Sequence, residues 1–259
     1  MIDLHSHILP GVDDGVRTLD EAVEMARAAA AEGVTAIAAT PHVRHDYPTS
    51  AARMEHGVAD VRRAIQAAGL DVEVVAGGEL DLEFSDGLSD DEIRRFSLGA
   101  TGRYVLLEFP DSGWPLALDA RIASLRAKGV VALLAHPERN SEVRSRPSVL
   151  AAAVERGALV QLTAGSLEGR MGRTTQATAR RLLQLGLVHV LASDAHHPEL
   201  RAFGFAGAVA ALRDAGLARF LTEEAPAAIL RGDPIDRLPP RSGNPRRFGL
   251  GRLRGKLAR

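Results

Sequence analysis

The chain has 259 residues, 46% of them hydrophobic, and a formal net charge of −1 at pH 7, so it can bury one barrel-sized α/β domain or two small domains. It contains no cysteine, which excludes disulfides, thiolate metal sites and any mechanism with a cysteine nucleophile. It also lacks a signal-like N-terminal segment and an apolar run of membrane-spanning length, so we expect a soluble, cytoplasmic protein.

The charge is unevenly distributed along the chain. Residues 237–259 contain eight Lys or Arg and no acid, whereas the remainder is net acidic. We expect residues 1–232 to form a single domain and residues 233–259 to form a poorly ordered basic tail rich in Pro, Gly and Arg. This tail could contact acidic peptides or an anionic membrane surface weakly, while the acidic body argues against a nucleic-acid partner.

Short apolar segments alternate with amphipathic ones along the first 232 residues. Thr18 with Glu21, and Ser89 with Glu92, have the spacing of helix capping boxes. The segments predicted to be strands are residues 1–4, 35–40, 72–76, 104–109, 130–135, 158–162 and 188–192. The segments predicted to be helices are residues 19–32, 50–68, 89–96, 115–128, 147–156, 175–185, 204–215 and 222–230.

This β-α alternation predicts an α/β fold with a parallel sheet. Glu79, Glu108, His136 and Asp194 each follow or end a strand, at intervals of 29, 28 and 58 residues. A unit of roughly 30 residues is typical of a TIM-like (β/α) barrel. An open doubly wound sheet is the alternative, and the pattern alone separates the two poorly.

The first predicted strand ends at His5-Ser6-His7. In an extended segment, side chains two residues apart point to the same side, so both imidazoles can reach one metal ion. A turn and two carboxylates, Asp13 and Asp14, follow. Asp14 is our candidate ligand, although Asp13 could serve in its place or one of the two could merely cap the turn.

Other ionisable residues also fall at the carboxyl ends of predicted strands. In a parallel barrel these ends form a single face, where active sites are built. A lone strand-end His or Glu is more often hydrogen-bonded to the backbone than bound to a metal, but the joint pattern favours a metal site. The complete candidate set is His5, His7, Asp14, His42, Glu79, Glu108, His136, Asp194 and His196.

These five imidazoles and four carboxylates suit Mn, Fe, Zn or Co better than Mg or Ca, which prefer oxygen alone. Nine ligands fit two or three ions that share bridging carboxylates. Three divalent ions would leave the site net positive and therefore attractive to a phosphate ester. Arg139 and Arg201 are placed to hold phosphate oxygens, although Arg139 could instead pair with Glu138 or Glu142. We expect His45, His56, His189 and His197 to be surface or structural residues.

With these residues assembled, the sequence resembles the PHP (polymerase and histidinol phosphatase) superfamily. It is most similar to the manganese-dependent protein-tyrosine phosphatases of bacterial capsule and exopolysaccharide systems, the CpsB/CapC type. The resemblance covers residues 1 to about 230 and rests on the motifs DLHSHILPGVDDG, ATPH, GGEL, LLEF, AHPERN, LTAGSL and ASDAH.

The resemblance implies a distorted seven-stranded (β/α)7 barrel, the PHP fold, with a trinuclear manganese site. One ion would be held by His5, His7, Glu79 and Asp194. Glu79 would bridge to a second ion at Glu108 and His136, and the third would bind Asp14, His42 and His196. Arg139 and Arg201 match the family's phosphate-contacting arginines. The basic tail has no counterpart in the pattern.

The implied activity is hydrolysis of protein phosphotyrosine by metal-activated water, without a phosphoenzyme. The implied substrate is the tail of a bacterial tyrosine autokinase that controls polysaccharide synthesis. Histidinol-phosphate phosphatase activity would use the same fold and ions. A nuclease would need a basic groove, and a catalytically silent, metal-stabilised partner of a kinase complex would not need the complete ligand set.

Overall fold

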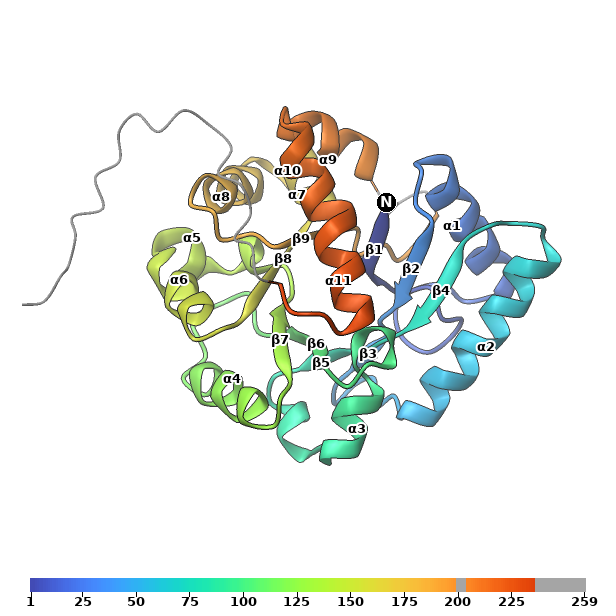
Figure 1. Ribbon diagram of the computed structural model, residues 1–259, viewed down its shortest axis with the longest axis horizontal. Helices are drawn as coiled ribbons and strands as arrows, with labels where there is room; N and C mark the ends of the chain where they lie inside the picture. The colour runs from blue at the N-terminus through green and yellow to red at the C-terminus, as the bar shows by residue number, and fades with distance from the viewer. Residues whose placement is uncertain (199–203, 236–259) are drawn as a thin grey trace, which may run out of the picture.

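The computed structural model describes residues 1–198 and 204–235, and within them the chain folds as an α/β protein whose strand pairs are all parallel (Figure 1). The strands are β1 (Ile2–Ser6), β2 (Ala36–Ala39), β3 (His42–Val43), β4 (Glu73–Ala76), β5 (Glu79–Asp81), β6 (Tyr104–Glu108), β7 (Val131–Leu134), β8 (Leu159–Thr163) and β9 (Val190–Ala192). The helices are α1 (Leu19–Ala31), α2 (Ala51–Ala67), α3 (Asp90–Arg95), α4 (Leu118–Ala127), α5 (Ser141–Ser145), α6 (Ser148–Glu155), α7 (Ala164–Glu168), α8 (Arg173–Gln184), α9 (Phe205–Leu212), α10 (Ala215–Arg219) and α11 (Ala225–Arg231).

The described strands form two hydrogen-bonded sheets, ordered β1-β2-β4 and β3-β5-β6-β7-β8-β9. The sheets meet where β1 lies beside β9, through a single parallel bridge between Ser6 and Ala195. The sequence predicted one strand over residues 35–40 and another over residues 72–76. These two strands are present as β2 and β4. After two further residues, each is followed by a short strand of the other sheet, β3 after β2 and β5 after β4. Two short strands were therefore missed, and they carry His42 and Glu79 at their first positions.

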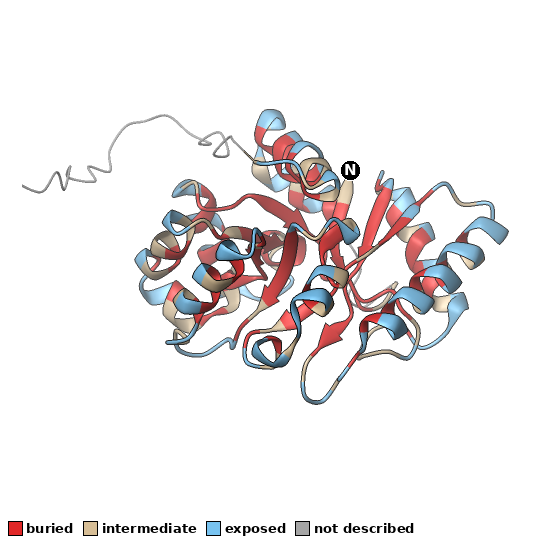
Figure 2. Cartoon of the chain, turned by 60° about the horizontal axis from the view of Figure 1, so that its bottom comes forward, coloured by how far each residue is buried: buried red, intermediate tan, exposed pale blue. Residues whose placement is uncertain are grey.

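Two buried apolar layers flank the strands. One lies between the strands and the surrounding helices, whose inner faces are buried and outer faces exposed (Figure 2). The other is a smaller cluster on the opposite side of the strands, and it joins residues of both sheets, including Leu4, Leu106 and Leu133. Burial of these aliphatic groups, about 25 cal/mol per Å² of apolar surface, holds the two sheets around a common interior.

The amino ends of the strands are closed by α11. In Figure 1 this helix crosses in front of the strands, and its Ile229 belongs to the interior cluster together with Tyr104, the first residue of β6. The Tyr104 hydroxyl donates to the carbonyl oxygen of Asp233, just after the helix, at 2.6 Å. The opposite, carboxyl ends of the strands remain available for a site.

Local sequence signals account for most helix boundaries. The Ser89–Glu92 capping box is present at the start of α3. At α1, Thr18 accepts the Glu21 N–H as predicted, but the Glu21 carboxylate accepts the N–H of Arg17 rather than completing the box. The short helices α5, α7 and α10 were not predicted. In the described part of the chain, no helix combines the length and apolar character needed to cross a bilayer.

Candidate metal centre

All nine candidate ligands come together at the carboxyl ends of the strands. They form four overlapping groups in which one ligand atom from each member lies within 4.8 Å of the others. The groups are His5, His7 and Asp194; His5, Glu79 and His136; His42, Glu79 and Glu108; and His7, Asp14, His42 and His196. The overlap matches a cluster in which neighbouring ions share ligands.

A bulge in β1 aims the first two imidazoles. Between Asp3 and Ser6 the register of β1 against β2 shifts, as a β-bulge next to a functional site often does. The Nε2 atoms of His5 and His7 end 3.3 Å apart, and both lie 3.3–3.4 Å from Oδ1 of Asp194. The two rings therefore converge on one carboxylate oxygen.

The hydrogen bonds at the far side of these rings test whether a cation fits. His5 Nδ1 lies 3.2 Å from Oε1 of Gln161, and His7 Nδ1 lies 2.7 Å from Oδ2 of Asp13. When neutral imidazoles donate through Nδ1, their Nε2 atoms carry lone pairs. Two lone pairs facing each other across 3.3 Å repel unless a cation lies between them, so the residues present fit a metal ion.

Glu79, fully buried at the start of β5, is central to the cluster. Its Oε1 lies 2.9 Å from His136 Nε2 and 3.2 Å from His5 Nε2, and its Oε2 lies 2.8 Å from His42 Nδ1. Within the described residues, Glu79 Oε2 and His42 Nδ1 are buried without hydrogen-bond geometry to any partner. Because unsatisfied buried polar atoms are costly, their convergence is a second observation that fits a bound ion.

Asp13 and Asp14 have separate positions. The Asp14 carboxylate reaches the cluster, with Oδ1 at 3.3 Å from His196 Nε2 and 3.5 Å from His42 Nε2. Asp13 instead accepts from the ring of His7 and from the backbone N–H of His42. The geometry thus favours Asp14 as the ligand and Asp13 as the group that orients the His7 ring and anchors the backbone at His42.

Two ligand positions lie on strained backbone. His136 follows β7 with φ 34° and Asp194 follows β9 with φ 52°. A left-handed conformation costs a residue with a side chain of the order of 1–3 kcal/mol, and such residues concentrate at functional sites. The two strand ends turn sharply inward in this way, which brings both side chains over the interior.

The electrostatics of the cluster favour positive charge. Burial opposes charging of Glu79 and Asp194, but neighbouring imidazoles, chiefly His5, hold the pKa of both carboxyls well below the usual range. Burial likewise opposes protonation of His7, but Asp13 beside it raises the pKa of this ring well above its usual value. Carboxylates arranged in this way stabilise protons or metal cations in the same space.

Arg139 lies at the edge of this cluster. Its guanidinium donates to the Asp194 carboxylate and, at 3.0 Å, to the hydroxyl of Thr163. Its Nε is buried without a hydrogen-bond partner among residues 1–198 and 204–235. Arg139 is therefore held by Asp194, not by Glu138 or Glu142, and keeps one donor free. Arg201 lies outside the described residues.

Several residues that support the ligands were not predicted. Gln161 in β8 accepts the backbone N–H of His136 through the same Oε1 that meets His5. Asp3 in β1 accepts the backbone N–H groups of His5 and Ser193, and burial raises its pKa to about 6. Each is a polar residue within an otherwise apolar buried strand, and that break in the pattern is the sequence signal that could have found them.

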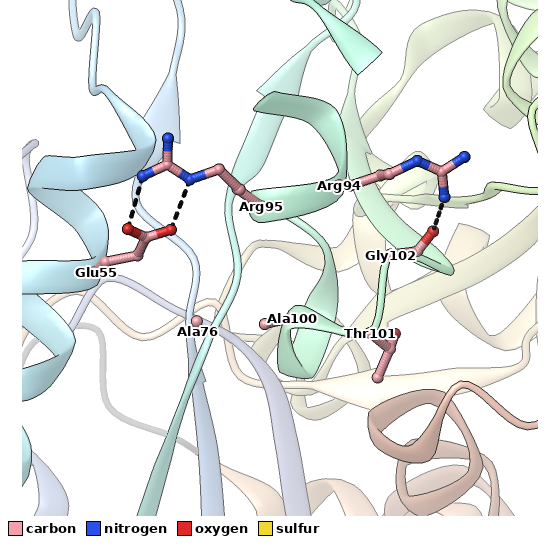
Figure 3. A pocket seen from close by; sticks show the side chains of 7 residues that line it. All are labelled: Glu55, Ala76, Arg94, Arg95, Ala100, Thr101 and Gly102. Carbon is pink, nitrogen blue, oxygen red and sulfur yellow. Dashed lines mark hydrogen bonds and ion pairs between the residues drawn. The ribbon is translucent and has the colours of Figure 1, made fainter. Parts of the chain in front are cut away.

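The cluster opens to solvent on one side. The side chains of Asp14 and Glu108 are 43% and 19% exposed, whereas those of His5, His7 and Glu79 are fully buried. A separate hollow beside α3 contains none of the candidate ligands (Figure 3). Arg95 in its wall is neutralised by a paired contact with Glu55. The candidate ligands therefore lie at the strand ends and not in this hollow.

Comparison with known proteins adds to this geometry. The sequence profile of the family described as capsular polysaccharide synthesis, CpsB/CapC, matches residues 1–230. The chain belongs to this family. It is 36% identical over 246 residues to the tyrosine-protein phosphatase YwqE of Bacillus subtilis, an alignment that covers 93% of this chain and 95% of that protein.

Two further comparisons within the CpsB/CapC family agree. The tyrosine-protein phosphatase CpsB of Streptococcus pneumoniae is 25% identical over 207 residues, covering 78% of this chain and 85% of that protein. A structure from the crystallographic study of YwqE and CpsB, described there as metal-dependent tyrosine phosphatases, superimposes with a TM-score of 0.83 at 33% identity. That match covers 93% of this chain and 98% of the other. The family resemblance inferred from the motifs is confirmed.

Proposed function

We propose that this protein is a metal-dependent protein-tyrosine phosphatase that acts in bacterial capsule or exopolysaccharide synthesis. The observation that carries the proposal is the convergence of nine imidazole and carboxylate ligands into overlapping groups at one rim. Membership of a family whose named members are tyrosine phosphatases supports the reaction. The two sheets, joined at β1 and β9, are compatible with the family's distorted seven-stranded barrel.

The nine ligands would hold two or three ions, for which manganese is our first choice and iron, zinc or cobalt are alternatives. Bound divalent ions supply charge neutralisation for the phosphate and lower the pKa of water. We assign His5, His7 and Asp194 to one position and Asp14, His42 and His196 to another, because each set is grouped in the structure. Glu79 belongs to two of the groups, one with His5 and His136 and one with His42 and Glu108, as a bridging ligand would.

Arg139 has the properties of a phosphate-binding residue. Asp194 and Thr163 fix one end of its planar guanidinium, and the side chain remains 16% exposed, which leaves the rest of the guanidinium for a phosphate oxygen. Since a planar fork matches two oxygens of a phosphate, the residue can orient the ester as well as neutralise it. We assign the same role to Arg201 from its match to the family motif.

The substrate we propose is phosphotyrosine in a protein, namely the tail of a bacterial tyrosine autokinase, reached in the cytoplasm. A phenolate is a good leaving group, so a general acid has little to contribute. Without cysteine in the chain, no cysteinyl phosphoenzyme can form. The proposed reaction is therefore direct hydrolysis of the ester.

The test is phosphate release from a phosphotyrosine peptide by the purified protein, with metal content measured on the same sample. We expect manganese to stimulate turnover, chelation to abolish it, and thiol alkylation to leave it unchanged. Histidinol phosphate is the matched competing substrate and should be cleaved less efficiently. Full activity after complete chelation, or a preference for histidinol phosphate, would contradict the proposal.

A further inference from the structure

A tight hairpin stands beside the open side of the metal centre. Residues 43–48 turn back on themselves through an antiparallel bridge between Val43 and Pro48. Arg44 and Tyr47 exchange both of their backbone hydrogen bonds, each 3.1 Å long. The hairpin begins one residue after His42, so its position is fixed directly to a candidate ligand.

The ring of Tyr47 extends the wall of the site. It lies nearly parallel to the imidazole of His42, with 14° between the planes and 5.9 Å between the ring centres. Among the residues that the structure describes, Tyr47 supplies the only non-histidine ring stacked on a candidate ligand. Its side chain is partly exposed, so this aromatic surface is accessible from outside.

Arg44 holds the hairpin to the rim of the cluster. Its guanidinium carbon lies 5.4 Å from the centre of the Tyr47 ring, within cation–π range. Asp46 binds its Nε and Nη2 at 2.7 and 2.8 Å, and its Nη1 lies 3.7 Å from Oε2 of Glu108. The aromatic ring is therefore held beside His42, and Arg44, which contacts the ring, also reaches Glu108 at the side where the cluster is exposed.

An aromatic surface at the open side of the metal centre, such as the Tyr47 ring, suits an aryl phosphate substrate. Its ring is attached to phosphorus through one oxygen, so a phosphate bound at the cluster carries the ring directly into the opening. Offset aromatic contacts provide attraction that an alkyl phosphate cannot obtain. Resting on the proposed phosphatase function, we infer that Tyr47, positioned by Arg44, contacts the phenyl ring of phosphotyrosine and determines selectivity for aryl over alkyl phosphate esters.

The experiment compares the manganese-loaded wild type with Tyr47→Leu and Tyr47→Phe. The substrates are a phosphotyrosine peptide, 4-nitrophenyl phosphate and a phosphoserine peptide. We expect Tyr47→Leu to lower the aryl-to-alkyl ratio of kcat/KM about tenfold, the upper range for an aromatic contact, mainly through KM. Tyr47→Phe should restore the ratio to within about twofold. Phe84→Leu is the control for hairpin packing, because that ring contacts His45 of the same hairpin rather than a candidate ligand, and it should leave the ratio unchanged.

Metal content and the inhibition constant of inorganic phosphate separate substrate contact from a structural role. Both should be the same in Tyr47→Leu and wild type. An equal fall on aryl and alkyl esters, a loss of metal, or an unchanged ratio would each overturn the inference. If the wild type cleaves 4-nitrophenyl phosphate but ignores phosphotyrosine peptides, the proposed function fails while the ratio on that ester still decides the role of Tyr47. A protein that cleaves neither aryl ester overturns both.

Discussion

The two ends of the strands contain buried histidines that experience opposite environments. At the carboxyl ends, Asp13 raises the pKa of His7 despite full burial. At the amino end of β9, His189 is also buried, but among the residues that the structure describes no carboxylate offsets its desolvation, and its pKa falls to about 4. Its Nδ1 accepts the backbone N–H of Val160 instead. The same kind of side chain is thus a candidate metal ligand at one end and a neutral structural acceptor at the other.

The difference extends to packing. The amino ends surround an apolar interior that α11 covers, whereas the carboxyl ends hold charged groups, unsatisfied polar atoms and strained backbone. Natural proteins tolerate such costs at functional sites when the remainder of the fold compensates. We therefore expect substitutions at the two ends to separate activity from stability.

The largest effect is expected at the centre of the rim. Glu79→Gln keeps the shape of the side chain but removes the charge that contacts four imidazoles, those of His5, His7, His42 and His136. Activity should fall by more than about 100-fold, beyond the loss typical of outer ligand supports. Metal content measured by elemental analysis should fall with it. Wild-type turnover with a full metal complement would show that Glu79 is not a ligand.

The interior supplies the opposite case. Leu133 in β7 is completely buried in the cluster that joins both sheets. Leu133→Ala should lower the free energy of unfolding by about 2–5 kcal/mol, because it removes buried methyl groups and leaves a cavity. Denaturant titration measures this loss. The kcat per folded molecule should stay at the wild-type level, and a large change in kcat would mean that the two ends are not independent.

The buried His189 gives the amino end its own pH response. Its pKa is depressed in the fold, so the unfolded chain binds the proton first as pH falls. Stability is therefore complete above the unfolded pKa of about 6.5 and is lost towards pH 4, by about 3 kcal/mol. His189→Asn keeps an acceptor but removes this titration. Unfolding followed from pH 7 to pH 4 in chelator should show a shallower decline for the variant, and identical slopes would refute the assignment.

The smallest effect concerns backbone strain. Ala100, exposed near α11, has φ 55°, a conformation that glycine adopts without cost. Ala100→Gly should raise the free energy of unfolding by about 0.5–1 kcal/mol, the relief of strain less the entropy cost of glycine, and should leave turnover unchanged. His136→Gly relieves similar strain at the other end but removes a candidate ligand, so turnover should collapse. Equal activity in both variants would remove the contrast between the two ends.

Local sequence chemistry predicted most elements correctly but failed where long-range pairing controls the chain. The Ser89 cap and the apolar runs of β6 and β7 depend on neighbouring residues alone, and they are where they were expected. The strands β3 and β5 contain two and three residues, too short for a periodic signal. They exist because each pairs with a neighbour brought in by the fold, His42 beside Glu79 and Glu79 beside Leu106.

By itself the sequence determined the α/β class, the family and the nine residues that form the cluster, because residue type and position after apolar strands are readable along the chain. Only the tertiary structure decided how those residues share their contacts. It separated Asp13 from Asp14, placed Arg139 on Asp194, and brought Gln161 and Tyr47 to the ligands. These choices depend on distances between segments remote in sequence, set by a bulge, two left-handed residues and the pairing of strands, which no local pattern encodes.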